Sequence, residues 1–353
     1  MDKITAFIDT SVFIKENFTA SRSFQQLLEL AAQNEINLII TDIVYGEVLS
    51  NQAKQLEEAL PIMKKTYNIR NKEGRVLRCY EDLEALFVYP DLDKGKLIAQ
   101  FRKAFDEKIE KAHIDIISSK DTKVDYIFDR YFAKDPPFSE KKKDEFPDAF
   151  SLKTIIEHVK SRRIKNFCIV AGDSDLLIKE VRNFSCFKEV SELINEHISR
   201  KKKYTETLAL IARIYKEKIE ELCYFKDEIF SLFEAYVYSG KYNPDSFKEI
   251  ESIDDIKIPK VKFAKDYNVI EINDRSAIIE TTVEIYYQIE FTYNDYEGAY
   301  YEKEEDEWYF LEQETDVVDE YKTFPVTIEI DYAPPAGSEF GDAEIIDIDL
   351  SIL

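Results

Sequence analysis

The strongest constraint on the fold is a change in hydrophobic period along the chain. Apolar runs at residues 4–8 and 36–40 are each followed by a segment with helical apolar spacing. From Ile279 to Phe291, apolar residues alternate with acidic and polar ones. The first pattern is typical of a parallel sheet wrapped by helices, and the second of an antiparallel sheet with one apolar and one wet face. We predict an α/β domain followed by an antiparallel β domain.

A strongly charged stretch interrupts the α/β pattern. Residues 67–145 have mostly helical spacing and are expected to form a helical insertion. The pattern resumes with a helix that opens near Pro147 and a strand over 166–171. One long helix is expected over 203–238, with an apolar stripe suited to packing or dimerisation. The predicted domains are an α/β domain over 1–200, a helical connector over 201–259 and an acidic β-rich domain over 260–353.

The negative charge is concentrated near the C-terminus. The 353 residues carry a net charge of −23, and residues 266–353 hold 25 acidic residues against 3 basic ones. The preceding residues hold 46 acidic and 45 basic residues, so this part is almost neutral and can bind nucleic acid, whereas the tail repels it. The four cysteines stand apart and no apolar run reaches membrane-span length, so we expect a cytoplasmic protein with reduced thiols.

Acidic residues stand where strands of the predicted parallel sheet end or the next helix begins. They are Asp9, Glu47, Asp148, and Asp173 with Asp175. The carboxyl ends of parallel strands meet at one edge, so we expect these carboxylates to converge. Their mutual repulsion calls for a cation, and oxygen ligands suit Mg²⁺ or Mn²⁺. A metal held there would activate water for phosphodiester hydrolysis.

Other side chains near these acids are candidate contacts for a substrate. The hydroxyls of Thr10 and Ser11 stand beside Asp9, where each could bond a carboxylate or a metal-bound water. Lys142 lies in a basic run before Asp148, and Lys153 follows one turn after it. We expect these four residues to contact the substrate, with the lysines reaching its phosphates.

Four segments together resemble the PIN domain, a family of metal-dependent nucleases. They are FIDTSVF (7–13), TDIVYGEV (41–48), FPDAFSL (146–152) and IVAGDSDLL (169–177). The resemblance places the family's four acids on Asp9, Glu47, Asp148 and Asp173, and a further acid that the family often adds on Asp175. It implies a Mg²⁺- or Mn²⁺-dependent endoribonuclease acting on single-stranded RNA. Larger bacterial members with such extensions resemble stress or phage-defence effectors.

Two other functions stay open. The PIN-like fold could be an inactive scaffold whose acidic β domain docks a basic partner, or the enzyme could be a structure-specific DNA nuclease, although DNA is less expected than RNA. The acidic sheet could also cover the active site or, with the long helix, mediate self-association or binding of a protein partner.

Some residues have simpler interpretations. Thr41 or Asp42 can cap the helix that follows residues 36–40, and a capping role is expected of Asp42 in place of a role in the site; Asp144 and Glu145 are expected to be solvated. The aromatic residues of 126–132 are expected to pack mostly in a core, although one could stack on an unpaired base.

Overall fold

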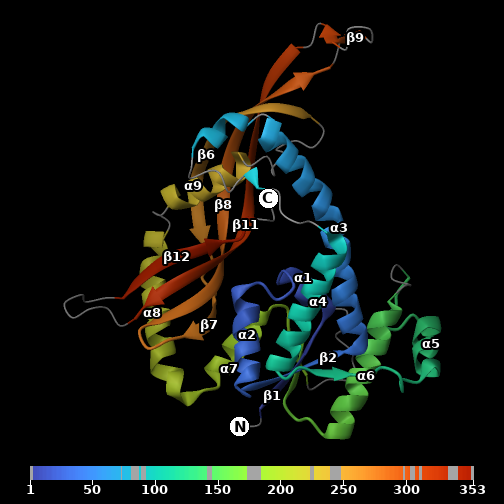
Figure 1. The fold of residues 1–353 in the computed structure, drawn as a ribbon. Helices are drawn as coiled ribbons and strands as arrows, with labels where there is room; N and C mark the ends of the chain where they lie inside the picture. Colours follow the sequence, from blue (N-terminus) through green and yellow to red (C-terminus); the bar gives the residue numbers. More distant parts are fainter. Residues whose placement is uncertain are drawn as a thin grey trace. The chain divides into compact units, whose positions relative to one another are not determined.

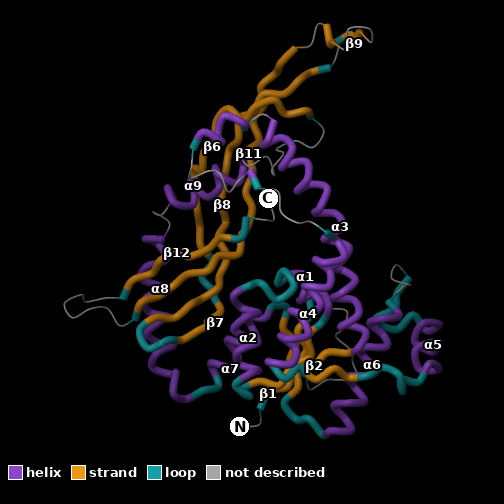
Figure 2. The backbone as a smooth tube through the Cα atoms, viewed as in Figure 1, coloured by secondary structure: helices purple, strands orange, loops and turns teal. Residues whose placement is uncertain are grey.

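The computed structural model describes residues 3–72, 74–80, 87–88, 93–140, 145–172, 184–222, 226–238, 248–296, 299–302, 307–309, 312–332 and 341–350. The chain divides into two compact units, Met1–Ile194 and Asn195–Leu353. Figures 1 and 2 show that strands alternate with helices in the first unit and that long strands dominate the second. Along the described part of the chain, none of the helices combines the length and the apolar character that a membrane span requires.

The first unit is built on a five-stranded sheet whose paired strands all run parallel. The order across the sheet is β3-β2-β1-β4-β5, with β1 at the centre. The strands are β1 (Ile4–Ile8), β2 (Ile36–Thr41), β3 (Asp115–Ile117), β4 (Phe167–Val170) and β5 (Ser185–Phe187). All residues of β1 and β4 are buried, as befits strands covered on both faces. The predicted parallel sheet is thereby confirmed.

Helices connect or follow the strands of this sheet in the chain, and several of them supply the rest of its core. The helices are α1 (Thr10–Lys15), α2 (Arg22–Ala32), α3 (Asp42–Lys72), α4 (Lys94–Lys111), α5 (Val124–Ala133), α6 (Phe146–Arg162) and α7 (Val190–Ser199), with a 3₁₀ turn η1 at Arg75–Cys79. The buried ring of Phe13 on α1 lies 5.0 Å from that of Phe24 on α2 and 5.7 Å from that of Phe105 on α4. Aromatic packing therefore fixes α1, which follows β1 directly.

The structure corrects two expectations in this unit. The stretch 67–145 is not purely helical, because β3 pairs with the end of β2 and forms one edge of the sheet. Three residues are too few to show a strand period in the sequence. Thr41, and not Asp42, caps α3: its hydroxyl accepts a hydrogen bond from the backbone N–H of Val44 at 3.2 Å. The Asp42 carboxylate instead accepts the N–H of Ser119, at 3.0 and 3.1 Å.

The second unit contains an antiparallel sheet of order β12-β11-β8-β6, with β7 also paired to β8. The strands are β6 (Glu249–Phe263), β7 (Asn268–Ile272), β8 (Ser276–Asp295), β11 (Glu312–Asp331) and β12 (Asp342–Ile348). A separate pair joins β9 (Tyr300–Glu302) to β10 (Glu307–Tyr309). Alternate residues of β8 from Val283 to Phe291 are fully buried, which confirms the antiparallel sheet with one apolar face.

Helices pack on the apolar face of this second sheet. They are α8 (Thr205–Leu222) and α9 (Lys226–Tyr236), and the 3₁₀ turn η5 (Lys202–Tyr204) precedes α8. The buried Tyr215 of α8 donates its hydroxyl to the carbonyl of Ala264 at 2.6 Å, and the ring of Phe233 on α9 lies 4.9 Å from Tyr287. Two helices thus occupy the stretch in which one long helix was expected.

Strand β6 begins at Glu249, inside the stretch for which a helical connector is expected. Its pairing with β8 shifts register at three places, between Ile250 and Ser252, between Ile253 and Asp255, and between Lys257 and Lys260. Each irregularity interrupts the alternation of faces, so no period of two is visible in its sequence.

Phe324 on β11 tests the core of the second unit because its side chain is fully buried. We expect Phe324→Ala to lower the free energy of unfolding of this unit by about 3–5 kcal/mol, since it leaves a ring-sized cavity. Chemical denaturation followed by circular dichroism measures the change. Val317→Ala, at a 53% exposed position of the same strand, should change it by less than about 0.5 kcal/mol. Equal small effects would contradict a core role for Phe324.

Candidate active site

Asp9 is held at the carboxyl edge of the parallel sheet by main-chain and side-chain hydrogen bonds. Its N–H donates to the carbonyl of Val170 on β4 at 3.0 Å, which continues the β1–β4 pairing by one residue. Its carboxylate caps α1, accepting the N–H of Ser11 at 3.0 Å and the Ser11 hydroxyl at 2.5 Å. A strand end and a helix start thus orient the same carboxylate.

The two hydroxyls after Asp9 both hold parts of the site in place. Thr10 donates its hydroxyl to the Glu47 carboxylate at 2.6 Å and so links α1 to α3. The Ser11 oxygen accepts the N–H of Gly172 at 3.0 Å, and a Cβ at Gly172 would stand only 3.3 Å from that oxygen. A residue without a side chain therefore allows this close approach between α1 and the end of β4.

Glu47 lies on α3 and shares the site with Asp9. Burial raises the pKa of the Glu47 carboxyl, the hydrogen bond from Thr10 lowers it, and the charges of Asp9 and Glu145 raise it again. The net direction is upward. Glu47 is therefore close enough to other carboxylates for their repulsion to oppose its ionisation.

Asp148 lies in the first turn of α6 and is the most strongly perturbed acid of the site. Burial, a hydrogen bond with Glu145, and the charges of Asp9, Glu145 and Glu47 raise its pKa to about 7. Two carboxyl groups share a hydrogen bond only if one of them keeps a proton. Acids from the end of β1, from α3 and from the start of α6 therefore form one electrostatic cluster.

Glu145 belongs to this cluster, although the sequence analysis expected it to be solvated. It is partly buried, immediately precedes α6, and hydrogen-bonds to Asp148 instead of capping the helix with its side chain. The signal that could have revealed it is its spacing of three residues from Asp148 at a helix start, which brings the two side chains together.

The remaining predicted site residues fall in two groups. Asp173, Asp175 and Lys142, together with Asp144, lie outside the described residues. Lys153 is described: its ammonium lies 3.2 Å from the Glu157 carboxylate and 4.0 Å from the centroid of the Tyr126 ring. In this structure Lys153 is thus engaged between α6 and α5.

The described acids fit a hard divalent cation by their chemistry. Among the described residues, the structure contains no group of three or more carboxylate, histidine or cysteine side chains already arranged around a metal position. Asp9, Glu47 and Asp148 nevertheless offer only oxygen donors, and burial followed by the charges of neighbouring carboxylates raises the pKa of Glu47 and of Asp148. A bound Mg²⁺ or Mn²⁺ would relieve this repulsion.

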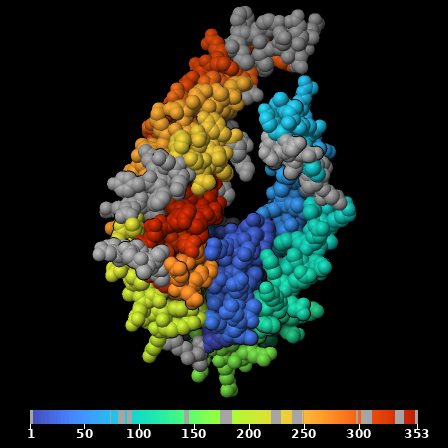
Figure 3. All heavy atoms as spheres, turned by 60° about the vertical axis from the view of Figure 1, so that its left-hand side comes forward, coloured from blue at the N-terminus to red at the C-terminus, as the bar shows by residue number. Residues whose placement is uncertain are grey.

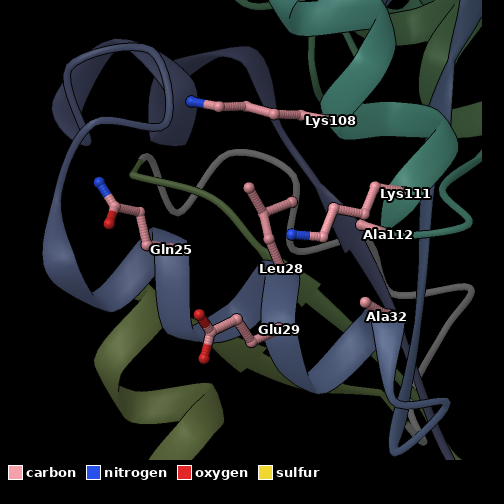
Figure 4. Close-up of a pocket in the computed structure, with 7 residues that line it drawn as sticks. All are labelled: Gln25, Leu28, Glu29, Ala32, Lys108, Lys111 and Ala112. Atoms are coloured by element: carbon pink, nitrogen blue, oxygen red, sulfur yellow. The ribbon is translucent and has the colours of Figure 1, made fainter.

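A pocket of about 250 Å³ lies elsewhere on the same unit, between α2 and α4. Those two helices lie side by side at the surface, in blue and teal (Figure 3). Lys108 and Lys111 line the pocket from α4, opposite Gln25 and Glu29 of α2 (Figure 4). Burial lowers the pKa of Lys108, whose ammonium donates to the Thr19 hydroxyl at 2.6 Å. None of the clustered acids lines this pocket.

A parallel sheet flanked by helices, with clustered carboxylates at its carboxyl edge, defines an α/β protein with a candidate acid-rich hydrolytic site. Residues 6–176, which lie within the first unit, match the family model of the PIN domain, so this part of the chain is a PIN domain. PIN domains are generally nucleases and typically use divalent metals. The matched range contains Asp9, Glu47, Glu145 and Asp148. No curated protein and no solved structure matched the chain in the comparisons.

The raised pKa of Asp148 predicts how the stability of the metal-free protein varies with pH. The ordinary pKa of this carboxyl is 3.8, and the folded value is about 7. The folded state therefore holds an extra proton between these values, so this group makes stability fall as pH rises from about 4 to 7. We expect Asp148→Asn to be more stable relative to the unchanged protein at pH 8 than at pH 5. Denaturation in EDTA measures this difference, and the opposite trend would contradict the cluster.

Proposed function

We propose that the protein is a Mg²⁺- or Mn²⁺-dependent endoribonuclease that hydrolyses phosphodiester bonds of single-stranded RNA. The observation that carries the proposal is the electrostatic cluster of Asp9, Glu47 and Asp148, in which the pKa of Asp148 is raised to about 7. Clustered carboxylates without a cation are unfavourable, and such sites are typical of metal-dependent catalysis.

The side chains divide the work of such a site. Asp9, Glu47 and Asp148 would hold the metal, which when bound would activate water and stabilise charge on the phosphate. Ser11 and Thr10 orient the first two carboxylates through hydrogen bonds of 2.5 and 2.6 Å. The PIN-domain resemblance adds Asp173 as a fourth ligand and Asp175 as an assisting acid.

The choice of RNA over DNA rests on the family resemblance. The first unit carries the acids, and most of the negative charge lies beyond residue 265, outside the matched range. A nearly neutral unit lets phosphates approach the acidic edge more readily than the net charge of −23 suggests.

Asp9→Asn and Asp148→Asn test the proposal. Each substitution keeps the shape of the side chain and removes a charge that the metal needs, so each should reduce cleavage of labelled single-stranded RNA at least about 100-fold. Asn also remains a good helix cap at position 9. Cleavage should require added Mg²⁺ or Mn²⁺ and stop with EDTA. Glu110→Gln, at an exposed position of α4, is the control and should cleave normally.

The same assay separates the alternative functions. RNA and DNA of matched sequence are digested side by side, and Mn²⁺ binding is followed by calorimetry. Cleavage of DNA alone would replace RNA by DNA as substrate. Binding of neither metal nor RNA would favour an inactive scaffold whose acidic β domain docks a partner. Full cleavage by Asp148→Asn would remove the site assignment.

A role as a stress or phage-defence effector is part of the proposal. An uncontrolled endoribonuclease depletes cellular RNA, so induced expression of the unchanged chain should stop bacterial growth, whereas Asp148→Asn should be tolerated. Growth curves and total-RNA profiles measure both effects at matched protein levels. Equal toxicity of the two chains would show that the growth effect does not come from cleavage.

A further inference from the structure

Helix α5 carries an exposed apolar stripe, which we call the α5 stripe. It consists of Val124, Phe128 and Phe132, which are 51%, 42% and 75% exposed. The spacing of four residues places them along one side of the helix. The rings of Phe128 and Phe132 are neighbours, with centroids 6.1 Å apart. Figure 1 shows α5 beside α6, the helix that begins at the acidic cluster.

The α5 stripe is not needed for the local core. That core is formed by Ile127, Phe138 and Ala149, with partly buried aromatic residues packed against it. Ile127 is fully buried and lies one position away from the stripe on the helix, so its side chain points in another direction. Phe132 leaves three quarters of its surface in water, an unfavourable arrangement for a ring with only a structural role.

Aromatic contacts connect the stripe to the start of α6, the helix that carries Asp148. The ring centroid of Phe128 lies 5.8 Å from that of Phe146, and the ring of Tyr131 lies 5.1 Å from it. Phe146 is the first residue of α6 and stands between Glu145 and Asp148 in the chain. The stripe therefore contacts α6 at its first residue, within the same helical turn as Asp148.

The charges around the stripe distinguish between kinds of contact. Asp125 and Asp129 are exposed on α5 next to the stripe, so this helix does not attract phosphates. Arg130 and Lys153 both lie over the ring of Tyr126, at 5.4 and 4.0 Å from its centroid. A nucleic acid on the stripe would thus interact through the faces of its bases. The nearest cations described here are Arg130 and Lys153, which lie over the neighbouring ring of Tyr126.

We propose that the α5 stripe is a stacking platform for unpaired bases of the RNA strand cleaved at the acidic cluster. This inference rests on the proposed function. Four residues of helix advance about 6 Å, which gives each ring room for one base at a stacking distance of about 3.4 Å. Bases in a duplex are already stacked on one another, so the platform selects single strands.

Phe132→Ala tests the platform in the full-length chain carrying Asp148→Asn, which prevents cleavage. Binding of a fluorescent 12-nucleotide RNA of A and U is measured by anisotropy. We expect Phe132→Ala to weaken binding about 5- to 150-fold, which corresponds to the loss of about 1–3 kcal/mol for one stacked base. Phe132→Trp should bind the RNA at least as tightly as the chain with Phe132, because indole presents a larger stacking face. The same RNA annealed to its complement should bind at least about 10-fold more weakly.

Ile62→Ala is the matched control, because Ile62 is a 66% exposed apolar residue on another helix of the same unit. It should leave the RNA affinity unchanged. Thermal melting checks that Phe132→Ala is folded, which its exposure favours. An affinity change within twofold of the control, or equal binding of single strand and duplex, would overturn the platform. Sedimentation showing that Phe132→Ala only dissociates a dimer, with RNA affinity intact, would also overturn it.

The failure of this inference is distinguishable from failure of the proposed function. Cleavage is measured separately, with Asp148 present. RNA cleavage with unchanged KM in Phe132→Ala would remove the platform and keep the nuclease. Stacking-dependent RNA binding by Phe132 without any metal-dependent cleavage would keep the platform and remove the nuclease.

Discussion

Parallel pairing of β1 with β2 and β4 is the constraint on which the rest of the first unit depends. It aligns the carboxyl ends of three strands whose sequence positions lie far apart, so that Ser11 and the N–H of Gly172, 161 residues later, meet at 3.0 Å. The apolar character of β1, in which every residue is buried, drives this pairing. The acids follow from it, because each stands just after a strand or in the helix that covers the same edge.

The acidic cluster is unfavourable for the folded metal-free chain. Burial and neighbouring carboxylates both disfavour ionisation of Asp148, and the fold retains this arrangement through specific hydrogen bonds. Thr10 and Ser11 hold Glu47 and Asp9, while α6 directs Asp148 and Glu145 to the same place. Functional sites often lower the stability of the folded protein in this way. Repulsion between the carboxylates destabilises the metal-free protein, and the same repulsion strengthens the binding of a cation.

The sequence predicted the elements with strong periodicity and missed those without it. Buried runs identified β1, β2 and β4, and alternation identified β8 and β11, because apolar contacts impose those periods. The short β3 has too few residues for a pattern, and the bulges of β6 break its alternation. Within the site, strand ends and the helices that follow or precede them predicted Asp9, Glu47 and Asp148 as neighbours, and burial together with the charges of nearby acids raises the pKa of Glu47 and of Asp148. Glu145 was missed although its spacing of three residues from Asp148 is visible in the sequence, because that spacing alone does not distinguish a solvated acid from one that faces Glu47 in the folded unit. The finer roles of the site residues stay predictions.

The double use of Asp9, as terminal residue of a strand and as cap of α1, bears on how this domain can change over evolution. Removing the side-chain oxygens of Asp9 leaves the N–H of Ser11 without this partner, and a lost cap costs about 1 kcal/mol. Asparagine keeps the cap and loses only the charge. A descendant that has lost catalytic activity can therefore carry asparagine at position 9 with little loss of stability. An aliphatic residue at the same position removes the cap of α1 and destabilises the fold.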